Sequence, residues 1–258
     1  MTASDIVHVA IAPPVALEAN LINKVAALIN KDPYETRLLL IGVIPKIVGH
    51  YQDMQTAETI AQRLREAGLV AIVCKDSELR KPSQNFRAHT MEFREGEVLF
   101  QDQGGHERRM LAGEIFLILK GKRQTQIETE TSETKMKLSW GATLLTGGIP
   151  IWRRVTQKTS EGAVRTESFA RLYEQKPSQS SVELVQHHMN YSFLGAKMTS
   201  SSLTNFDTVV TKLRETFPQS AFDDRLAKLP RKDLPLDRAQ ADLEINCRLL
   251  YLYHLATR

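Results

Sequence analysis

MQTAETIAQRLREAGLVAIVC, residues 54–74, is the stretch that decides the fold of the first part of the chain. In its first half, apolar side chains recur with a helical period, so that Ala57, Ile60, Ala61 and Leu64 share one face. Gly68 then supplies a helix stop, and six almost entirely apolar residues follow it. The stretch therefore predicts an amphipathic helix over 54–67 that leads into a buried strand over 69–74.

The residues before this stretch alternate in the same way between strand and helix patterns. Pro13 and Pro14 end a first apolar run, and a longer segment with a 3.6-residue apolar period follows. Asp32 as N-cap and Pro33 at the first helical position then begin a second helix. The predicted elements are a strand at 6–11, helices at 15–30 and 33–41, and a short strand or extended link at 45–51.

This order of elements resembles the C-terminal domain of the bacterial ribosomal stalk protein. The resemblance is carried by Asn23-Lys-Val-Ala26, by the helix Asp32-Pro-Tyr-Glu-Thr-Arg-Leu-Leu-Leu40, by Ile44-Pro45, and by Ala57 to Gly68 with the strand that follows. It implies a compact α/β module over residues 1–76 that recruits protein partners. In that family the partner surface surrounds the first helix pair, where Lys24 matches a family lysine.

Beyond a polar linker at 77–85, the pattern changes to short strands. Met91 and Phe93 alternate with polar residues, Glu95-Gly96 forms a turn, and Val98 and Phe100 alternate again, which predicts a β-hairpin. The continuous apolar run 115–119 is typical of a central strand. Further short strands are predicted at 182–186 and 189–194.

Two long polar segments, 122–137 and 151–170, are rich in threonine and alternate in the manner of solvated strands. We expect them to form antiparallel ribbons with a turn at Glu161-Gly162. The segment 205–217 has Phe206, Val209, Val210 and Leu213 on one face, which predicts a helix.

Several antiparallel strands closed by one amphipathic helix resemble a bacterial pleckstrin-homology-type domain, here over 86–226.

Residues 227–258 form a linker and a C-terminal amphipathic helix whose second half is nearly all apolar. This helix packs on its own body or docks elsewhere, for example on a second copy of the chain. The expected fold class is α+β: a small strand-helix-helix-strand-helix-strand domain, an antiparallel β-barrel or sandwich with a capping helix, and a C-terminal helix.

Bulk composition limits the class of protein. The 258 residues carry a net charge of +4, and the basic surplus lies in residues 81–180, which hold 16 Lys and Arg against 12 Asp and Glu. Two cysteines outside any C-x-x-C pair fit a reducing compartment. The first residues lack a secretory pattern, and the longest apolar runs are far shorter than the roughly 20 residues of a membrane span. We therefore expect a cytoplasmic protein without a transmembrane segment.

Tests for catalytic motifs give no match. No glycine-rich phosphate loop and no G-x-S-x-G elbow occurs, so no catalytic residue and no cofactor is predicted. The histidines lack metal-ligand spacing, and His8 is expected to be a satisfied core or edge residue. Cys74 and Cys247 lie in apolar patterns and are predicted to be small buried hydrophobes. The adjacent Asp223 and Asp224 are expected in a solvated turn or cap.

An apolar segment broken by Gly147-Gly148 and Pro150 is a candidate docking surface for a protein partner. Tryptophan is common at binding hot spots, whereas the ordinary interpretation of such a segment is a core-packing connection. The candidate partner-docking residues are Trp140, Leu144, Leu145, Ile149, Ile151 and Trp152.

A basic set on the two long polar segments is a candidate surface for anionic lipid or nucleic acid. Interleaved acidic residues, such as Glu128 and Glu130, favour instead an ordinary mixed-charge ribbon. The candidate residues are Lys120, Lys122, Arg123, Lys135, Lys137, Arg153, Arg154 and Lys158.

These patterns favour a non-catalytic interaction or adaptor protein with a protein partner. The first alternative is a peripheral binder of an anionic membrane surface or nucleic acid through the basic ribbon. The second is an enzyme whose site residues are assembled only by the fold.

Overall fold

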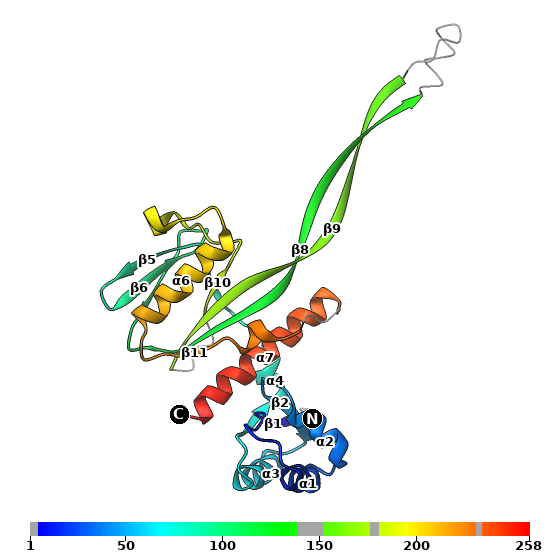
Figure 1. Ribbon diagram of the computed structural model, residues 1–258, viewed down its shortest axis with the longest axis vertical. Coiled ribbons are helices and arrows are strands. Elements are labelled where there is room, and N and C mark those ends of the chain that lie inside the picture. Colours follow the sequence, from blue (N-terminus) through cyan, green and yellow to red (C-terminus); the bar gives the residue numbers. More distant parts are fainter. Residues whose placement is uncertain (1–4, 139–151, 176–180, 231–233) are drawn as a thin grey trace. The chain divides into compact units, whose positions relative to one another are not determined.

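The computed structural model describes residues 5–138, 152–175, 181–230 and 234–258. Helices and antiparallel sheets occur together, which confirms the α+β class (Figure 1). The chain divides into two compact units: one contains residues 1–123 and 167–258, and the other contains residues 124–166. Within the described parts, no helix is long and apolar enough to cross a membrane.

The N-terminal module has the predicted order of elements. They are β1 (Val7–Ile11), α1 (Ala19–Ile29), α2 (Pro33–Leu40), β2 (Lys46–Tyr51), α3 (Met54–Glu66) and β3 (Ala71–Lys75). β1 is the middle strand and pairs antiparallel with both β2 and β3. Helices α1 and α3 cover one face of this sheet (Figure 1), where Val9, Val25 and Leu64 are fully buried.

Local signals fix α3 and the strand after it, as the sequence predicts. The Asp53 carboxylate accepts a hydrogen bond from the Thr56 backbone N–H at 2.7 Å and so caps the helix. Gly68 has φ +90°, a conformation that is strained for any residue with a Cβ, and it turns the chain into β3. Ala57, Ala61 and Leu64 form the buried stripe of the helix.

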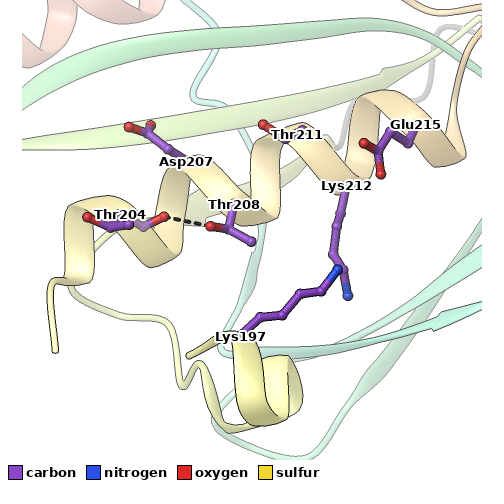
Figure 2. A pocket seen from close by; sticks show the side chains of 7 residues that line it. All are labelled: Lys197, Thr204, Asp207, Thr208, Thr211, Lys212 and Glu215. Carbon is purple, nitrogen blue, oxygen red and sulfur yellow. Dashed lines mark hydrogen bonds between the residues drawn. The ribbon is translucent and has the colours of Figure 1, made fainter. Parts of the chain in front are cut away.

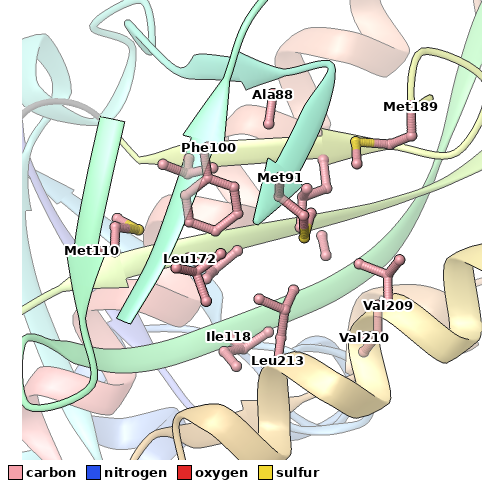
Figure 3. Close-up of a cluster of buried hydrophobic side chains, with 14 of the residues drawn as sticks. Ala88, Met91, Phe100, Met110, Ile118, Leu172, Met189, Val209, Val210 and Leu213 are labelled. Atoms are coloured by element: carbon pink, nitrogen blue, oxygen red, sulfur yellow. The ribbon is translucent and has the colours of Figure 1, made fainter. Parts of the chain in front are cut away.

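The second part of unit one contains two sheets and a helix. Strands β5 (Thr90–Arg94), β6 (Glu97–Gln101) and β7 (Glu107–Leu111) form an antiparallel meander whose first two strands are the predicted hairpin. The larger sheet has the order β11-β8-β9-β10-β4. Its strands are β4 (Phe86–Ala88), β8 (Ile115–Leu138), β9 (Trp152–Glu174), β10 (Val182–Val185) and β11 (Ala221–Asp223). Helix α6 (Ser202–Thr216) packs against both sheets through Val209, Val210 and Leu213 (Figure 3).

Two predictions for this region need correction, and one strand was not predicted. The larger sheet is not wholly antiparallel, because its edge strands β4 and β11 pair in parallel with β10 and β8. The strand β11, which follows the capping helix, was not predicted. Residues 189–194 are not a strand: Asn190 accepts a hydrogen bond from the Ser192 N–H at 3.0 Å, a local turn that replaces a strand ladder and leads into the 3₁₀ helix η1 (Ser192–Lys197).

The predicted turn at Glu161-Gly162 is also wrong. β9 continues through both residues as one strand next to β8. A single glycine does not end a strand whose neighbour continues to offer hydrogen-bonding partners. Unit two consists of these two strands between residues 124 and 166, and their connection at 139–151 lies outside the described residues.

The predicted linker begins with a short helix, α4 (Asp76–Leu79), whose Leu79 is buried against helix α7 (Leu236–Ala256).

Two faces of α7 pack on two different sheets. Leu249 contacts Ala10 and Ile72 of the N-terminal sheet, whereas Cys247 and Leu250 join a cluster on the larger sheet. This double burial explains why the second half of α7 is apolar nearly all round. Of the apolar residues in this half of the helix, Cys247, Leu249 and Leu250 are covered by the helix's own chain, whereas Leu255 is 39% exposed.

Candidate functional site

Helix α2 is short but fixed at both ends. The Asp32 carboxylate accepts a hydrogen bond from the Glu35 N–H at 2.9 Å, and Pro33 occupies the first helical position. At the other end, the Lys46 ammonium donates to the carbonyl oxygens of Leu38 at 2.8 Å and Ile41 at 2.5 Å. A cation at the helix C-terminus also complements the helix dipole. These contacts hold eight residues in a helix that would be too short to persist alone.

The two sides of α2 differ sharply. Thr36 and Leu40 face the module's interior and are buried. Tyr34, Leu38 and Ile41, spaced four and three residues apart, are 72%, 50% and 46% exposed. Because side chains four apart share a helix face, Tyr34 and Leu38 lie in one row on α2. Ile41 is the C-cap that ends the helix, and the exposed Val43 follows just beyond it. We call Tyr34, Leu38, Ile41 and Val43 the α2 face.

Basic residues lie on α1, on α2 and before and after α2. Lys31 pairs with Glu35 on the helix at 3.4 Å. Lys24 on α1 and Arg37 on α2 are exposed, and among the described residues no ion pair with a carboxylate is found for either side chain. Lys46 lies at the C-terminal end of the helix. The electrostatic surroundings of the α2 face are therefore positive.

Lys24 also lines an open cavity of about 480 Å³ beside the helix pair. The walls of the cavity come from the proline turn after β1, from the start of α1, from residues 67–70 and from Tyr253 of α7. Val15, at the tip of the proline turn, is fully exposed. The family resemblance implied that Lys24 lies on a partner surface. In this structure Lys24 is an exposed residue of α1 that lines the cavity.

His8 is buried and hydrogen-bonded, in keeping with its expected role. Its Nε2 lies 2.8 Å from Asp76 Oδ1, and its Nδ1 lies 2.8 Å from Nδ1 of the exposed His50. Arg80 donates to the same Asp76 oxygen at 2.7 Å. Burial and the neighbouring His8 lower the pKa of His50. In the described part of the chain, no group of three or more His, Cys, Asp or Glu side chains is arranged to hold a metal ion.

The expectation for Asp223 is wrong, whereas Asp224 is as predicted. Asp224 is exposed to an intermediate degree and pairs with Lys228 at 2.8 Å. Asp223 is only 5% exposed and accepts hydrogen bonds from His254 Nε2 at 2.8 Å and from Arg225 Nη2 at 2.6 Å. Burial alone would raise the pKa of Asp223, but these hydrogen bonds outweigh burial and hold the pKa well below its usual range. The cluster joins β11 to the last turn of α7.

Both cysteines are buried and free of disulfides, as predicted. Burial raises the pKa of the Cys74 thiol to about 11 and that of the Cys247 thiol to about 12. Neither thiol forms a thiolate at neutral pH, so neither is suited to nucleophilic chemistry.

The candidate residues from the sequence fall partly outside the described residues. Of the partner-docking set, Trp140, Leu144, Leu145, Ile149 and Ile151 lie there, and Trp152 is described only as the first residue of β9. In the basic set, Lys135 and Lys137 lie on β8, and Arg153, Arg154 and Lys158 lie on β9, with only their backbone described. Lys120 pairs with Asp207 at 2.8 Å, while Lys122 is exposed.

Arg123 is not available as part of a basic surface. Its guanidinium pairs with Glu167 at 2.9 Å and with Glu183 at 3.4 Å in a largely buried network.

The α2 face was not predicted from the sequence. Apolar residues at helical spacing usually mark a core face, and the spacing of Tyr34, Leu38 and Ile41 does not distinguish a buried face from an exposed one.

No family model, no curated protein and no solved structure matches this chain.

Proposed function

We propose that this chain is a protein-interaction module and that the α2 face is its partner surface. The carrying observation is the set Tyr34, Leu38 and Ile41, exposed on α2 and its C-cap, while the opposite side of the helix is well packed. Exposed apolar side chains that stand singly are normal on a protein surface, whereas a contiguous apolar set rimmed by charge is characteristic of a docking site. An exposed tyrosine at the start of the row adds a side chain that is enriched at binding hot spots.

The charges beside the α2 face define the kind of partner. Lys24, Arg37 and Lys46 give it a positive rim, so a segment that combines apolar side chains with acidic ones complements it. An amphipathic helix with an acidic border is the simplest such segment, because its apolar side chains repeat at the same three- and four-residue spacing.

The N-terminal module is proposed to be of the ribosomal-stalk type. Its order of elements and its sheet order β2-β1-β3 support this proposal, as does the position of the α2 face on the first helix pair. The pleckstrin-homology-type assignment of the second part remains a weaker proposal, since two of its strand pairings are parallel.

The experiment is a capture from native lysate with the full chain, compared with Leu38→Asp and Ile41→Asp variants. Met54→Asp is the matched control, because Met54 is another exposed apolar side chain at the start of α3. Proteins captured by the wild type and by Met54→Asp but lost with both α2 variants, at unchanged melting temperature, support the proposal. Equal capture by all four proteins overturns it.

A further inference from the structure

The loop between η1 and α6 is held in one shape by a buried side chain. Asn205 is buried, and its amide oxygen accepts hydrogen bonds from the Thr199 N–H at 2.7 Å and from the Thr199 hydroxyl at 2.9 Å. Its amide nitrogen donates to the Thr199 carbonyl at 2.8 Å. Gly195 turns the chain before the loop with φ +54°, and Ser201 caps α6 by accepting from the Thr204 N–H at 3.2 Å. The loop is therefore preorganised.

This fixed loop exposes two large apolar side chains. Met198 lies on the loop and is 52% exposed, and Leu203 lies in the first turn of α6 and is 50% exposed. A loop that is hydrogen-bonded this closely does not need exposed apolar residues for its own stability. Both side chains are thus free to enter an apolar phase outside the protein.

Two lysines converge beside this loop, and the first of them, Lys197, directly precedes Met198 in the chain. Lys197 and Lys212 line one cavity of about 380 Å³ on the outer side of α6, and Figure 2 shows the two side chains extending toward one another. Among the described residues, neither ammonium has an ion-pair partner, and Lys212 lies 5.0 Å from the ring centre of Phe93. Like charges that face one another repel unless an anion lies between them.

The carboxylates near the cavity do not balance these two charges. Asp207 is paired with Lys120 at 2.8 Å, which leaves Glu215 as the one carboxylate of the cavity lining without a described ion pair. The surface therefore keeps a positive surplus, although a moderate one.

We propose that this face docks on an anionic lipid bilayer. A lipid phosphate lies between Lys197 and Lys212, while Met198 and Leu203 enter the boundary between headgroups and acyl chains. The exposed Met198, next to Lys197 in the chain, and the exposed Leu203 at the start of α6 favour a lipid source over soluble phosphate or nucleic acid, since neither of these offers an apolar phase. This inference is independent of the α2 face and uses different residues.

Co-sedimentation of the full chain with vesicles tests the proposal. Binding is expected to vesicles of phosphatidylserine with phosphatidylcholine, to decrease with added salt, and to be weak with phosphatidylcholine alone. Each of Lys197→Gln and Lys212→Gln is expected to weaken binding about fivefold. Met198→Ser with Leu203→Ser is expected to weaken it further. Lys81→Gln, which removes another exposed lysine, serves as the matched control and should change nothing.

Several results would overturn the proposal. Absence of binding to anionic vesicles at low salt is one. Another is binding that survives the loss of Lys197 and Lys212 but disappears when Lys135, Lys137, Arg153, Arg154 and Lys158 are neutralised, which would place the contact on the ribbon. Inorganic phosphate that binds as well as vesicles, with no effect of the Met198 and Leu203 changes, would identify a soluble anion as the ligand.

Discussion

Arg171 and Glu183 lie directly opposite one another on β9 and β10, and both are buried, at 3% and 2% exposure. Arg171 donates to the same Glu183 oxygen from Nε at 2.9 Å and from Nη2 at 2.8 Å. The guanidinium also reaches Glu244 of α7, with Nη1 at 2.8 Å. One buried arginine thus joins the middle of the larger sheet to the C-terminal helix.

Removal of Arg171 is expected to destabilise the chain strongly. Arg171→Met leaves the buried Glu183 carboxylate without its main partner, which should cost about 3 kcal/mol of unfolding free energy. Arg171→Met combined with Glu183→Leu should cost less than the single change, because no unpaired charge remains on Glu183. Arg94→Met is the control, since Arg94 pairs with Glu92 at the surface and should cost about 0.5 kcal/mol. Urea denaturation measures all three, and a double variant that is less stable than Arg171→Met would contradict this account.

A second prediction concerns Thr36 on the buried side of α2. Its hydroxyl is the one buried side-chain polar atom without a hydrogen-bond partner in the part of the chain that the structure describes. Thr36→Val keeps the shape and removes the unsatisfied hydroxyl, so it should stabilise the protein by about 1 kcal/mol. Thr36→Ser keeps the hydroxyl and loses a methyl group, so it should destabilise by about 1 kcal/mol. Thermal unfolding followed by circular dichroism separates the two, and destabilisation by Thr36→Val would show that the hydroxyl has a partner.

The sequence was sufficient where local signals decide the structure. The apolar stripe of α3 and the stop at Gly68 lie within a few residues of one another, and the predicted helix and strand formed there. The same is true of the hairpin of β5 and β6.

Pairings between distant segments could not be predicted in this way. Arg171 and Glu183 alternate with apolar residues along their strands, which normally indicates a solvated face, and only the packing of α7 buries them. The α2 face is the opposite case, because an apolar row normally indicates a buried face, whereas no part of the described chain covers this one. Both outcomes depend on which segment covers a face, and single-sequence periodicity carries no information on that.

Gly121 provides a test of packing on the α7 side of the larger sheet. A Cβ at this position would lie 2.5 Å from a ring carbon of the buried Phe169 and 2.9 Å from Cβ of Leu226. Neither neighbour can move freely, so Gly121→Ala should cost about 1–3 kcal/mol. Gly113→Ala is the control, because a Cβ added there would meet no atom within 4 Å, and its effect should stay within about 0.5 kcal/mol. Equal stability of the two variants in urea would show that the Phe169 site is more adaptable than its geometry indicates.

Asp223 predicts a specific dependence of stability on acid pH. Its pKa in the folded chain is held below the ordinary value of 3.8 by hydrogen bonds from His254 and Arg225, in spite of burial. In acid the unfolded chain therefore binds the proton more readily than the folded chain does. The stability that Asp223 contributes is fully present above about pH 4 and is lost as the pH falls toward its folded pKa.

Asp223→Asn should consequently lower stability at neutral pH and flatten the fall in stability below about pH 4, so that the curves of variant and wild type converge in acid. Asp224→Asn alters the adjacent carboxylate, which pairs with Lys228 away from the cluster, and its curve should run parallel to that of the wild type. Urea unfolding at a series of pH values measures the three curves. Parallel curves for wild type and Asp223→Asn would mean that the Asp223–His254 contact does not link β11 to α7 in the folded chain.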